Sequence, residues 1–187
     1  MDKKSIWDLS RPSAEQYRGM EKMRLTVVLD NVRSLNNIGS LFRTADAFMV
    51  ERLALCGITA TPPSPEISKT ALGAENSVEW VYFDNTRDCI DKLKSEGYIV
   101  CCLEQVKGSV ELGSFVAEPD RKYALVCGHE VYGVNPEIVN MADVWLEIPQ
   151  GGTKHSLNVT VSTAIAMWQF FSRLRPDQID QRAEQQA

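Results

Sequence analysis

Short apolar runs alternate with amphipathic stretches along most of the chain. Three uninterrupted runs are bounded by polar turns: "LTVVL" (25–29), "YIVCCL" (98–103) and "YALVCG" (123–128). Such runs are typical of parallel strands that are buried on both faces of a sheet. Weaker strand patterns follow the same rule in "RLALCG" (52–57), "WVYF" (80–83) and "DVWLEI" (143–148).

The segments between these strands have helical periodicity. Apolar residues recur at helical spacing within residues 37–48, 86–96, 136–141 and 157–173. Strands that alternate with helices form one open α/β sheet, mostly parallel, with helices on both faces. We therefore predict this fold for residues 25–175.

Three other segments do not fit the alternation. Residues 1–24 have the pattern of a short amphipathic helical extension, and the polar tail 176–187 is expected to be a frayed helix or disordered. Segment 59–79, "TATPPSPEISKTALGAENSVE", predicts a long irregular excursion. Loops of this length in a compact domain are often functional.

The composition indicates one cytoplasmic domain. With 187 residues, 44% of them hydrophobic, the chain can bury one sizeable core and is short for two domains. No apolar run reaches the roughly 18 residues that a membrane-spanning helix needs, and the N-terminus lacks a signal-peptide pattern. The five cysteines fall mostly in apolar runs without CxxC spacing, so we expect reduced, buried thiols.

The charge balance argues against a protein that coats nucleic acid without specificity, because the net charge is −5. It leaves a local basic surface open. An ordinary solvated face would give the same grouping of basic residues near the start of the chain, at Arg11, Arg18, Lys22, Arg24, Arg33 and Arg43.

The first stretch that can carry chemistry is "DNVRSLNNIGSLFRTADAF" (30–48), after the first strand. Asn36 or Asn37 is expected to cap the following helix, and Gly39 lets another backbone approach closely. Nearly two helical turns separate Asn37 from Arg43, so both side chains can lie near one face. Arg43 has apolar neighbours, and there an arginine either forms a salt bridge or binds a phosphate or carboxylate.

The second stretch, "LVCGHEVYGVNPEIVNMAD" (125–143), has glycines at a spacing that superficially matches a phosphate-binding loop. The match fails, because Val134 stands at the position of the essential lysine and no Ser or Thr follows it. The first strand is not followed by GxGxxG, so neither ATP nor NAD binding is supported. What remains is a glycine turn at a strand end, where open α/β sheets usually bind ligands.

The third stretch is "IPQGGTKHSLN" (148–158), which leads into the apolar last helix. Ser156 is a suitable N-cap, so its polar neighbours are explained either by capping or by chemistry at the helix entry. His129 and His155 have no metal-ligand spacing with cysteines or acidic clusters. We expect them to be solvent-exposed or hydrogen-bonded, and we expect no metal.

Together, the three stretches resemble the SpoU/TrmH-type RNA ribose methyltransferases of the SPOUT class. The family's Asn-x-Gly-x-x-x-Arg motif matches residues 37–43, and its Gly-x-Glu motif with a later glycine matches residues 128–133. Its Ile-Pro, glycine and Ser-Leu-Asn-Val-Ser motif matches residues 148–160, with Thr160 in place of the last serine. The motifs occur in the family order.

The resemblance implies that S-adenosylmethionine binds in a C-terminal trefoil knot, largely through backbone groups of the strand-end loops. The positions that it assigns to this cofactor are Leu103, Glu104, Gln105, Gly128, Ile148, Gln150 and Leu157. Glycines at 128, 151 and 152 would then be useful because side chains there would block the ligand.

The resemblance also implies a catalytic group that consists of Arg43, Asn37, Glu130, Ser156 and Asn158. Arg43 would either accept the proton of the ribose 2′-hydroxyl or position a phosphate. The second role is kept open because a guanidinium holds its proton tightly and is a poor base in water. The other four would hold Arg43 and the ribose by hydrogen bonds, so Ser156 and Asn158 would both begin the helix and line the pocket.

The implied partners are RNA and a second copy of the chain. Transfer RNA suits the chain somewhat better than ribosomal RNA, because an added N-terminal RNA-binding domain of larger relatives is not seen. We expect a homodimer through the last helix, because Trp168, Phe170 and Phe171 exceed what one buried face requires. In the family, such pairing brings one subunit's arginine near the other's cofactor.

Three other readings stay open. A noncatalytic RNA-binding relative would keep the knot but not the turnover. A base methyltransferase of the SPOUT class is disfavoured, because Arg43 and the Ser156-Leu157-Asn158 run belong to the ribose branch. A plain nucleotide-binding α/β module is disfavoured by the missing phosphate loop.

Overall fold

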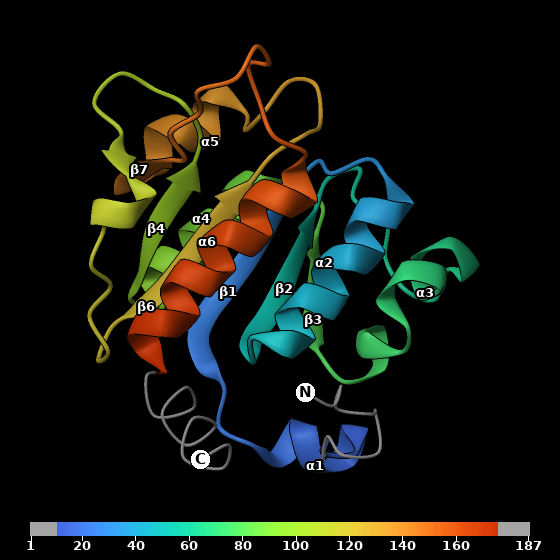
Figure 1. The fold of residues 1–187 in the computed structure, drawn as a ribbon. Coiled ribbons are helices and arrows are strands. Elements are labelled where there is room, and N and C mark those ends of the chain that lie inside the picture. The colour runs from blue at the N-terminus through green and yellow to red at the C-terminus, as the bar shows by residue number, and fades with distance from the viewer. Residues whose placement is uncertain (1–10, 176–187) are drawn as a thin grey trace, which may run out of the picture.

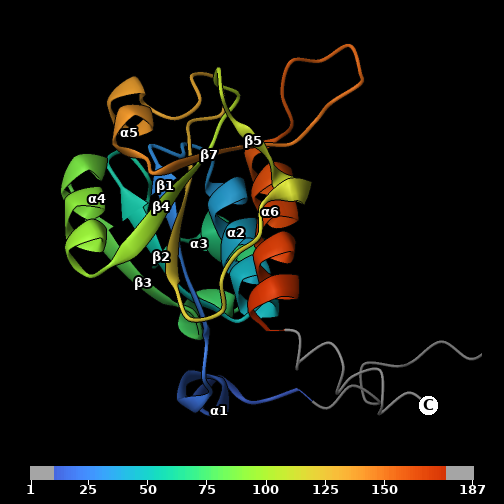
Figure 2. The same ribbon diagram turned by 90° about the vertical axis from the view of Figure 1, so that its left-hand side faces the viewer.

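The computed structural model describes residues 11–175, which form a seven-stranded sheet between two layers of helices (Figures 1 and 2). The strand order is β3-β2-β1-β6-β4-β7-β5, and every neighbouring pair is parallel. The predicted α/β fold is confirmed. The strands are β1 (Met23–Asp30), β2 (Val50–Cys56), β3 (Glu79–Phe83), β4 (Tyr98–Leu103), β5 (Val110–Glu111), β6 (Lys122–Cys127) and β7 (Val144–Glu147).

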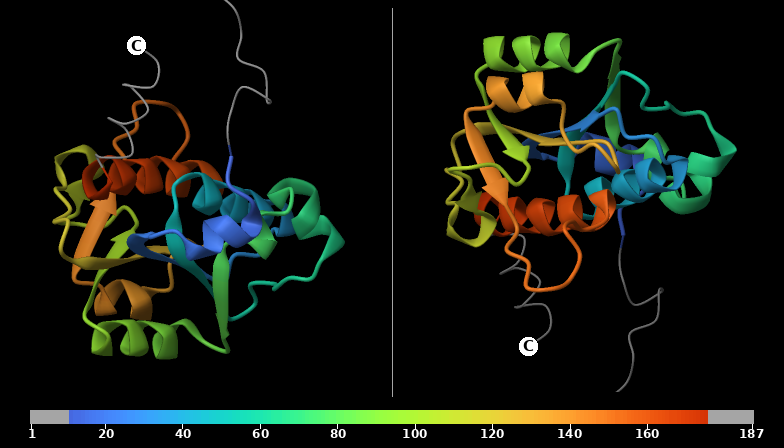
Figure 3. Two further views of the ribbon diagram at one scale, coloured as in Figure 1. Left: turned by 90° about the horizontal axis from the view of Figure 1, so that it is seen from below. Right: turned by 90° about the horizontal axis from the view of Figure 1, so that it is seen from above.

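Helices cover both faces of the sheet, as the view from above in Figure 3 shows. On one face α2 packs between α3 and α6, and on the other face α4 packs beside α5. The short α1 lies beyond the sheet, at the bottom of Figure 1. The helices are α1 (Ala14–Gly19), α2 (Leu35–Ala47), α3 (Pro65–Ala71), α4 (Thr86–Ser95), α5 (Pro136–Met141) and α6 (Val159–Leu174).

The core has two parts because the sheet is buried on both sides. Val27 packs into the cluster beneath α2 and α6, whereas its neighbour Val28 packs into the cluster beneath α4 and α5. Neither valine is exposed to solvent. Successive residues of a strand point to opposite faces, which explains why the central strands are uninterrupted apolar runs.

Two elements were not predicted from the sequence. Helix α3 lies within the segment 59–79 that we expected to be irregular, so that prediction is wrong for Pro65–Ala71. Only Ile67 and Ala71 of α3 are buried, which is too few apolar positions to give a periodic signal. Strand β5 has two exposed residues that pair with β7, and it has no strand pattern of its own.

The caps of two helices differ from the expected ones. Helix α2 begins at Leu35 and is capped by Ser34, whose hydroxyl accepts a hydrogen bond from the Asn37 N–H at 3.4 Å. Helix α6 begins at Val159 and is capped by Asn158, whose side-chain oxygen accepts from the Thr160 N–H at 2.9 Å. Ser156 is therefore not a cap but lies in the exposed segment before the helix.

Within the expected N-terminal extension, residues 1–24, the structure describes one short helix, α1. Tyr17 is only 5% exposed, and its hydroxyl donates to the backbone oxygen of Asp46 at 3.2 Å, which fixes α1 near the end of α2. The rest of the extension, residues 1–10, and the tail 176–187 lie outside the described residues.

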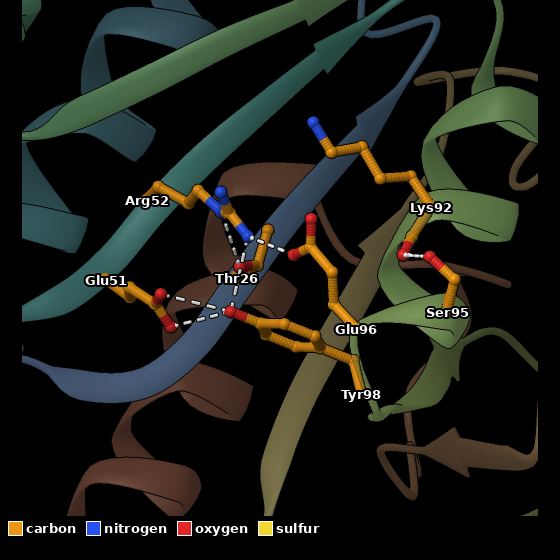
Figure 4. Close-up of polar contacts among 7 residues, drawn as sticks. All are labelled: Thr26, Glu51, Arg52, Lys92, Ser95, Glu96 and Tyr98. Carbon is orange, nitrogen blue, oxygen red and sulfur yellow. Dashed lines mark hydrogen bonds and ion pairs between the residues drawn. The ribbon is translucent and has the colours of Figure 1, made fainter.

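A polar network joins strands and helix at the amino ends of the sheet, as Figure 4 shows. The Arg52 guanidinium contacts Glu96 at 3.0 Å and Thr26 at 3.3 Å, and the Tyr98 hydroxyl donates to Glu51 at 2.9 Å. Burial raises the pKa of Tyr98, whose hydroxyl is a donor at neutral pH. The network thus lies away from the carboxyl ends of the strands, where parallel α/β sheets bind ligands.

The predicted state of the cysteines is confirmed: all five are buried free thiols, and burial raises the pKa of Cys101 to about 12. Within residues 11–175, no helix is long and apolar enough to cross a membrane.

Candidate active site

A cavity of about 340 Å³ lies at the carboxyl ends of β4, β6 and β7. Parallel α/β sheets bind ligands at this edge, where the loops leave the strands. The cavity is lined by every position that the resemblance assigns to the cofactor: Leu103, Glu104, Gln105, Gly128, Ile148, Gln150 and Leu157. Glu130 and Ser156 of the catalytic group line it too.

Glu130 connects the turn after β6 to the start of α2. Its carboxylate accepts hydrogen bonds from the backbone N–H groups of Arg33 at 3.1 Å and Ser34 at 2.9 Å. The side-chain amide of Asn37 donates to the same carboxylate at 2.9 Å. A carboxylate that receives three hydrogen bonds fixes both segments, so Glu130 positions Asn37 beside the cavity.

These hydrogen bonds also set the charge of Glu130. Burial alone would raise the pKa of the carboxyl, but the donors of Ser34, Arg33 and Asn37 outweigh it and lower the pKa. Glu130 is therefore ionised at neutral pH. A carboxyl with a lowered pKa stabilises the fold above its unfolded value of about 4.3, and the contribution is lost as the pH falls through the folded pKa.

Asn37 also meets the start of α6. Its side-chain oxygen accepts from the Asn158 amide at 3.4 Å, and its backbone oxygen accepts from the Thr160 hydroxyl at 3.5 Å. Thr160, which replaces the serine of the family motif, thus still supplies a hydroxyl. One residue from each of the three sequence motifs, Asn37, Glu130 and Asn158, therefore belongs to one hydrogen-bonded group.

Glu104 has a side-chain role that the sequence did not predict. Its carboxylate accepts from the backbone N–H groups of Val134 and Gln105, each at 3.0 Å. Residues 128–134 form a tight hairpin, in which His129 and Gly133 exchange two backbone hydrogen bonds of 2.9 Å. Glu104 thus holds one side of this hairpin, whereas Glu130 holds the other.

Two of the motif glycines, Gly128 and Gly39, are required for backbone packing. A Cβ at Gly128 would lie 2.2 Å from the backbone of Gly133 and Val134, so the hairpin can close only over a glycine. A Cβ at Gly151 or Gly152 would meet no protein atom within 4 Å, so packing within the chain does not require these two glycines, and their role toward a ligand stays a prediction. A Cβ at Gly39 would lie 2.2 Å from the Ile67 oxygen of α3, which confirms the expected close approach.

Arg43 is the one member of the proposed catalytic group that the single chain does not bring to the others. It lies on the exposed face of α2 and is not part of the cavity lining. Its side chain forms no ion pair with any residue in the range 11–175, so the salt-bridge interpretation is not supported.

Several lining residues were missed by the sequence reasoning, including His129, Val131, Tyr132 and Glu147. The first three lie between the glycines of the second stretch, and this position was the available signal. His129 is hydrogen-bonded, because its Nδ1 accepts from the Val131 N–H at 3.0 Å. No group of three or more His, Cys, Asp or Glu side chains within the described part of the chain is suited to hold a metal ion.

The chemistry of the lining is mixed. Leu103, Ile148 and Leu157 give the cavity apolar walls, whereas Glu104, Glu130 and Glu147 add carboxylates. Apolar walls accommodate a flat ring, and carboxylates favour a positively charged group. The residues present therefore fit a ligand that carries an aromatic base at one end and a cationic centre elsewhere, as S-adenosylmethionine does with its adenine and its sulfonium.

The sequence and the fold of this chain are similar to those of a known protein family. The family model "SpoU rRNA Methylase family" matches residues 24–168. The chain is 26% identical over 183 residues to a tRNA (guanosine(18)-2′-O)-methyltransferase of Borreliella burgdorferi, with 95% of this chain and 79% of that protein covered.

Two solved structures are similar as well. The TrmH/SpoU tRNA modifying enzyme of A. aeolicus matches with a TM-score of 0.76 and 27% identity, over 88% of this chain and 83% of that one. The AdoMet-bound rRNA methyltransferase of Sinorhizobium meliloti matches with a TM-score of 0.74 and 28% identity, over 82% and 59% of the two chains.

The length of the matches differs among the relatives. The chain spans 63% of the length of several curated relatives that it matches, so those proteins contain further segments. The family model itself covers most of the chain, including all three motifs and every residue of the hydrogen-bonded group described above. The chain therefore belongs to the SpoU rRNA methylase family of RNA methyltransferases.

Proposed function

We propose that this SpoU-family chain is an S-adenosylmethionine-dependent methyltransferase that modifies the ribose 2′-hydroxyl of a nucleotide in transfer RNA. The observation that carries the proposal is the meeting of Asn37, Glu130 and Asn158 beside the cavity at the strand ends. Three sequence motifs that lie far apart in the chain converge there on one group of polar side chains.

Transfer RNA is favoured as the substrate by the relatives. The Borreliella protein, which is matched along 95% of this chain, is described as acting on guanosine 18 of transfer RNA at the 2′-oxygen. The A. aeolicus structure is described as a tRNA modifying enzyme, whereas the Sinorhizobium structure is an rRNA methyltransferase. Ribosomal RNA is the alternative substrate within the same reaction.

The methyl donor fits the cavity. Its volume of about 340 Å³ lies within the roughly 300–1,000 Å³ of small-molecule sites. Leu103, Ile148 and Leu157 would contact the adenine end, and the carboxylates would favour the positive sulfonium. When bound, S-adenosylmethionine supplies an electrophilic methyl group. We expect this binding region to be the trefoil knot of the family.

The protein's own task is to prepare the ribose. A 2′-hydroxyl is a weak nucleophile until its proton leaves, so a positioned acceptor raises the rate. Ser156 and Asn158 lie next to the cavity and are exposed, so both can donate to or accept from a ribose. Arg43 then binds the adjacent phosphate through its planar fork or accepts the proton, whereas Glu130 holds Asn37 in place.

A homodimer would bring Arg43 to a reaction centre. Helices α2 and α6 lie side by side on the same outer face (Figure 1), and Phe48, the residue that follows α2, contacts Trp168 of α6 with ring centroids 5.8 Å apart. Val161, Ile165 and Trp168 form an exposed apolar stripe along α6, with 48%, 41% and 49% exposure. Phe170 and Phe171, which we counted toward this interface from the sequence, belong to the core.

The test is the mass spectrometry of nucleosides from purified transfer RNA and ribosomal RNA of cells with and without the gene. We expect one 2′-O-methylated nucleoside to disappear from transfer RNA in the deletion strain and to return when the purified protein and S-adenosylmethionine are added. Loss from ribosomal RNA alone would assign that substrate. Unchanged nucleosides in both RNAs, together with donor binding, would support the noncatalytic relative.

A further inference from the structure

The tip of the hairpin 128–134 exposes an aromatic ring beside the donor cavity. Tyr132 is 83% exposed and Val131 is 70% exposed, the highest values among the large apolar side chains of the described residues. Both residues line the cavity. Single exposed apolar residues are common on protein surfaces, but two adjacent ones at the rim of a ligand site call for a function.

The backbone that carries Tyr132 is held on every side. His129 and Gly133 exchange two hydrogen bonds, Gly128 packs directly on the Gly133–Val134 backbone, and Glu104 accepts from the Val134 N–H. Glu130, next to His129 in the hairpin, is fixed by the three hydrogen bonds that its carboxylate accepts. The ring therefore projects from a rigid support, and little backbone entropy is lost when a ligand contacts it.

The ring itself is oriented by His129. The two ring centroids lie 4.8 Å apart with planes tilted by 40°, and Nδ1 of His129 is fixed by the Val131 N–H. Because Tyr132 remains 83% exposed with this contact in place, most of its ring surface is open to solvent. An aromatic face that is open and oriented is a surface on which a flat ring can stack.

We propose that Tyr132 is a substrate-binding residue on which an unpaired base of the RNA stacks at the rim of the donor cavity. Unpaired bases of RNA are recognised by stacking on aromatic side chains. The backbone N–H of Arg33 donates to the carboxylate of Glu130, which precedes Tyr132 by two positions in the sequence. The Arg33 side chain is exposed and provides a cation for the phosphate next to the stacked base. The assignment rests on the proposed function.

The hydroxyl of Tyr132 is not needed for stacking, which allows a graded set of variants. Tyr132→Phe keeps the aromatic face, Tyr132→Leu keeps apolar bulk without a π-face, and Tyr132→Ala removes both. Tyr82→Leu is the control, because Tyr82 is an exposed tyrosine on the edge strand β3, which β2 and β1 separate from the strands of the cavity. Methyl transfer from labelled S-adenosylmethionine is measured with bulk transfer RNA from cells that lack the gene.

Loss of one stacked base costs about 1–3 kcal/mol, so Tyr132→Ala should raise the KM for RNA about 5- to 150-fold. Tyr132→Leu should fall near Tyr132→Ala, and Tyr132→Phe should stay within about twofold of the wild type, because the π-face carries the effect. The Kd for S-adenosylmethionine by calorimetry should not change in any variant, and the melting temperature should not change in the Tyr132 variants. An equal loss in Tyr132→Phe, or a raised Kd for the donor, would overturn the stacking role.

A readout without turnover separates the stacking role from the reaction. Ultraviolet irradiation of the wild-type protein with the same RNA should leave a nucleotide adduct on Tyr132 in the peptide that contains residues 129–133. An adduct without methyl transfer would support base stacking on Tyr132 and refute the proposed reaction. If no adduct forms and Tyr132→Ala transfers methyl groups with an unchanged KM, base stacking on Tyr132 is refuted and the proposed reaction is supported.

Discussion

Replacement of Gly39 by alanine tests whether close packing of α2 on α3 explains the glycine of the first motif. The new Cβ would lie 2.2 Å from both the Ile67 backbone oxygen and the Thr70 hydroxyl, and 3.1 Å from the Ala71 nitrogen. The Ile67 oxygen belongs to a helix backbone and cannot rotate away. Helix α3 must therefore move, and the hydrogen bond from Thr70 to the Asn36 oxygen, now 3.0 Å, is strained.

Two opposing effects decide the magnitude. Alanine within a helix is favoured over glycine by about 1 kcal/mol, whereas overpacking of a close contact typically costs about 1–3 kcal/mol. Because backbone is the obstacle here, we expect the upper part of that range and a net loss of about 1–2 kcal/mol. For a domain of this size, this corresponds to a fall of about 2–8 °C in the melting temperature.

Thermal unfolding followed by circular dichroism measures the effect, with denaturant unfolding as a second measure. Gly19→Ala is the matched control, because a Cβ at Gly19, the last residue of α1, meets no atom within 4 Å. That variant should have an unchanged or slightly raised melting temperature. If Gly39→Ala is as stable as the wild type or more so, close packing does not explain the glycine.

Three further predictions concern the proposed reaction. Arg43→Ala should lower methyl transfer by about 10²–10⁴-fold, as expected for a lost proton acceptor, with fold and donor affinity retained. Arg43→Lys should fail as well, and near-normal turnover of either variant would exclude a role for this guanidinium. Calorimetry should detect S-adenosylmethionine binding at equal strength with and without EDTA, and a requirement for a divalent ion would contradict the metal-free site. Light scattering should give twice the 21.0 kDa chain mass at micromolar concentration, and the monomer mass would count against a dimer.

Much of the fold was predictable because the sheet is buried on both faces. Uninterrupted apolar runs such as 25–29 and 98–103, separated by polar turns and helical patterns, are typical of parallel strands that are buried on both faces. Helix α3 was not predicted because it has little apolar periodicity of its own. It is stabilised by packing against α2, where its backbone lies close to Gly39. Tertiary contacts of this kind leave no periodic signal in the sequence.

The convergence of the three motifs beside one cavity was predictable from the sequence, whereas several lining residues and most contacts were not. Asn37 was expected to be a possible helix cap, but its side chain bonds Glu130 and Asn158, and Ser34 caps the helix instead. Both amides and serines satisfy helix N-termini, so local sequence cannot choose between them. Arg43 shows the other limit: its side chain forms no ion pair with any residue in the range 11–175, and the role proposed for it depends on a second subunit, which the sequence of one chain does not describe.

The hydrogen bond between Asn37 and Glu130 has a consequence for synthesis of the protein. The two residues are 93 positions apart, which a ribosome spans in about 5–19 s at typical elongation rates. During this interval β1 can pair with β2, but β6, its other neighbour in the sheet, has not been made. The nascent chain therefore carries an unpaired apolar strand edge, which is a template for aggregation. This edge can be covered once residues 122–130 have been made, because the same short segment completes the β1–β6 strand pair and anchors Asn37.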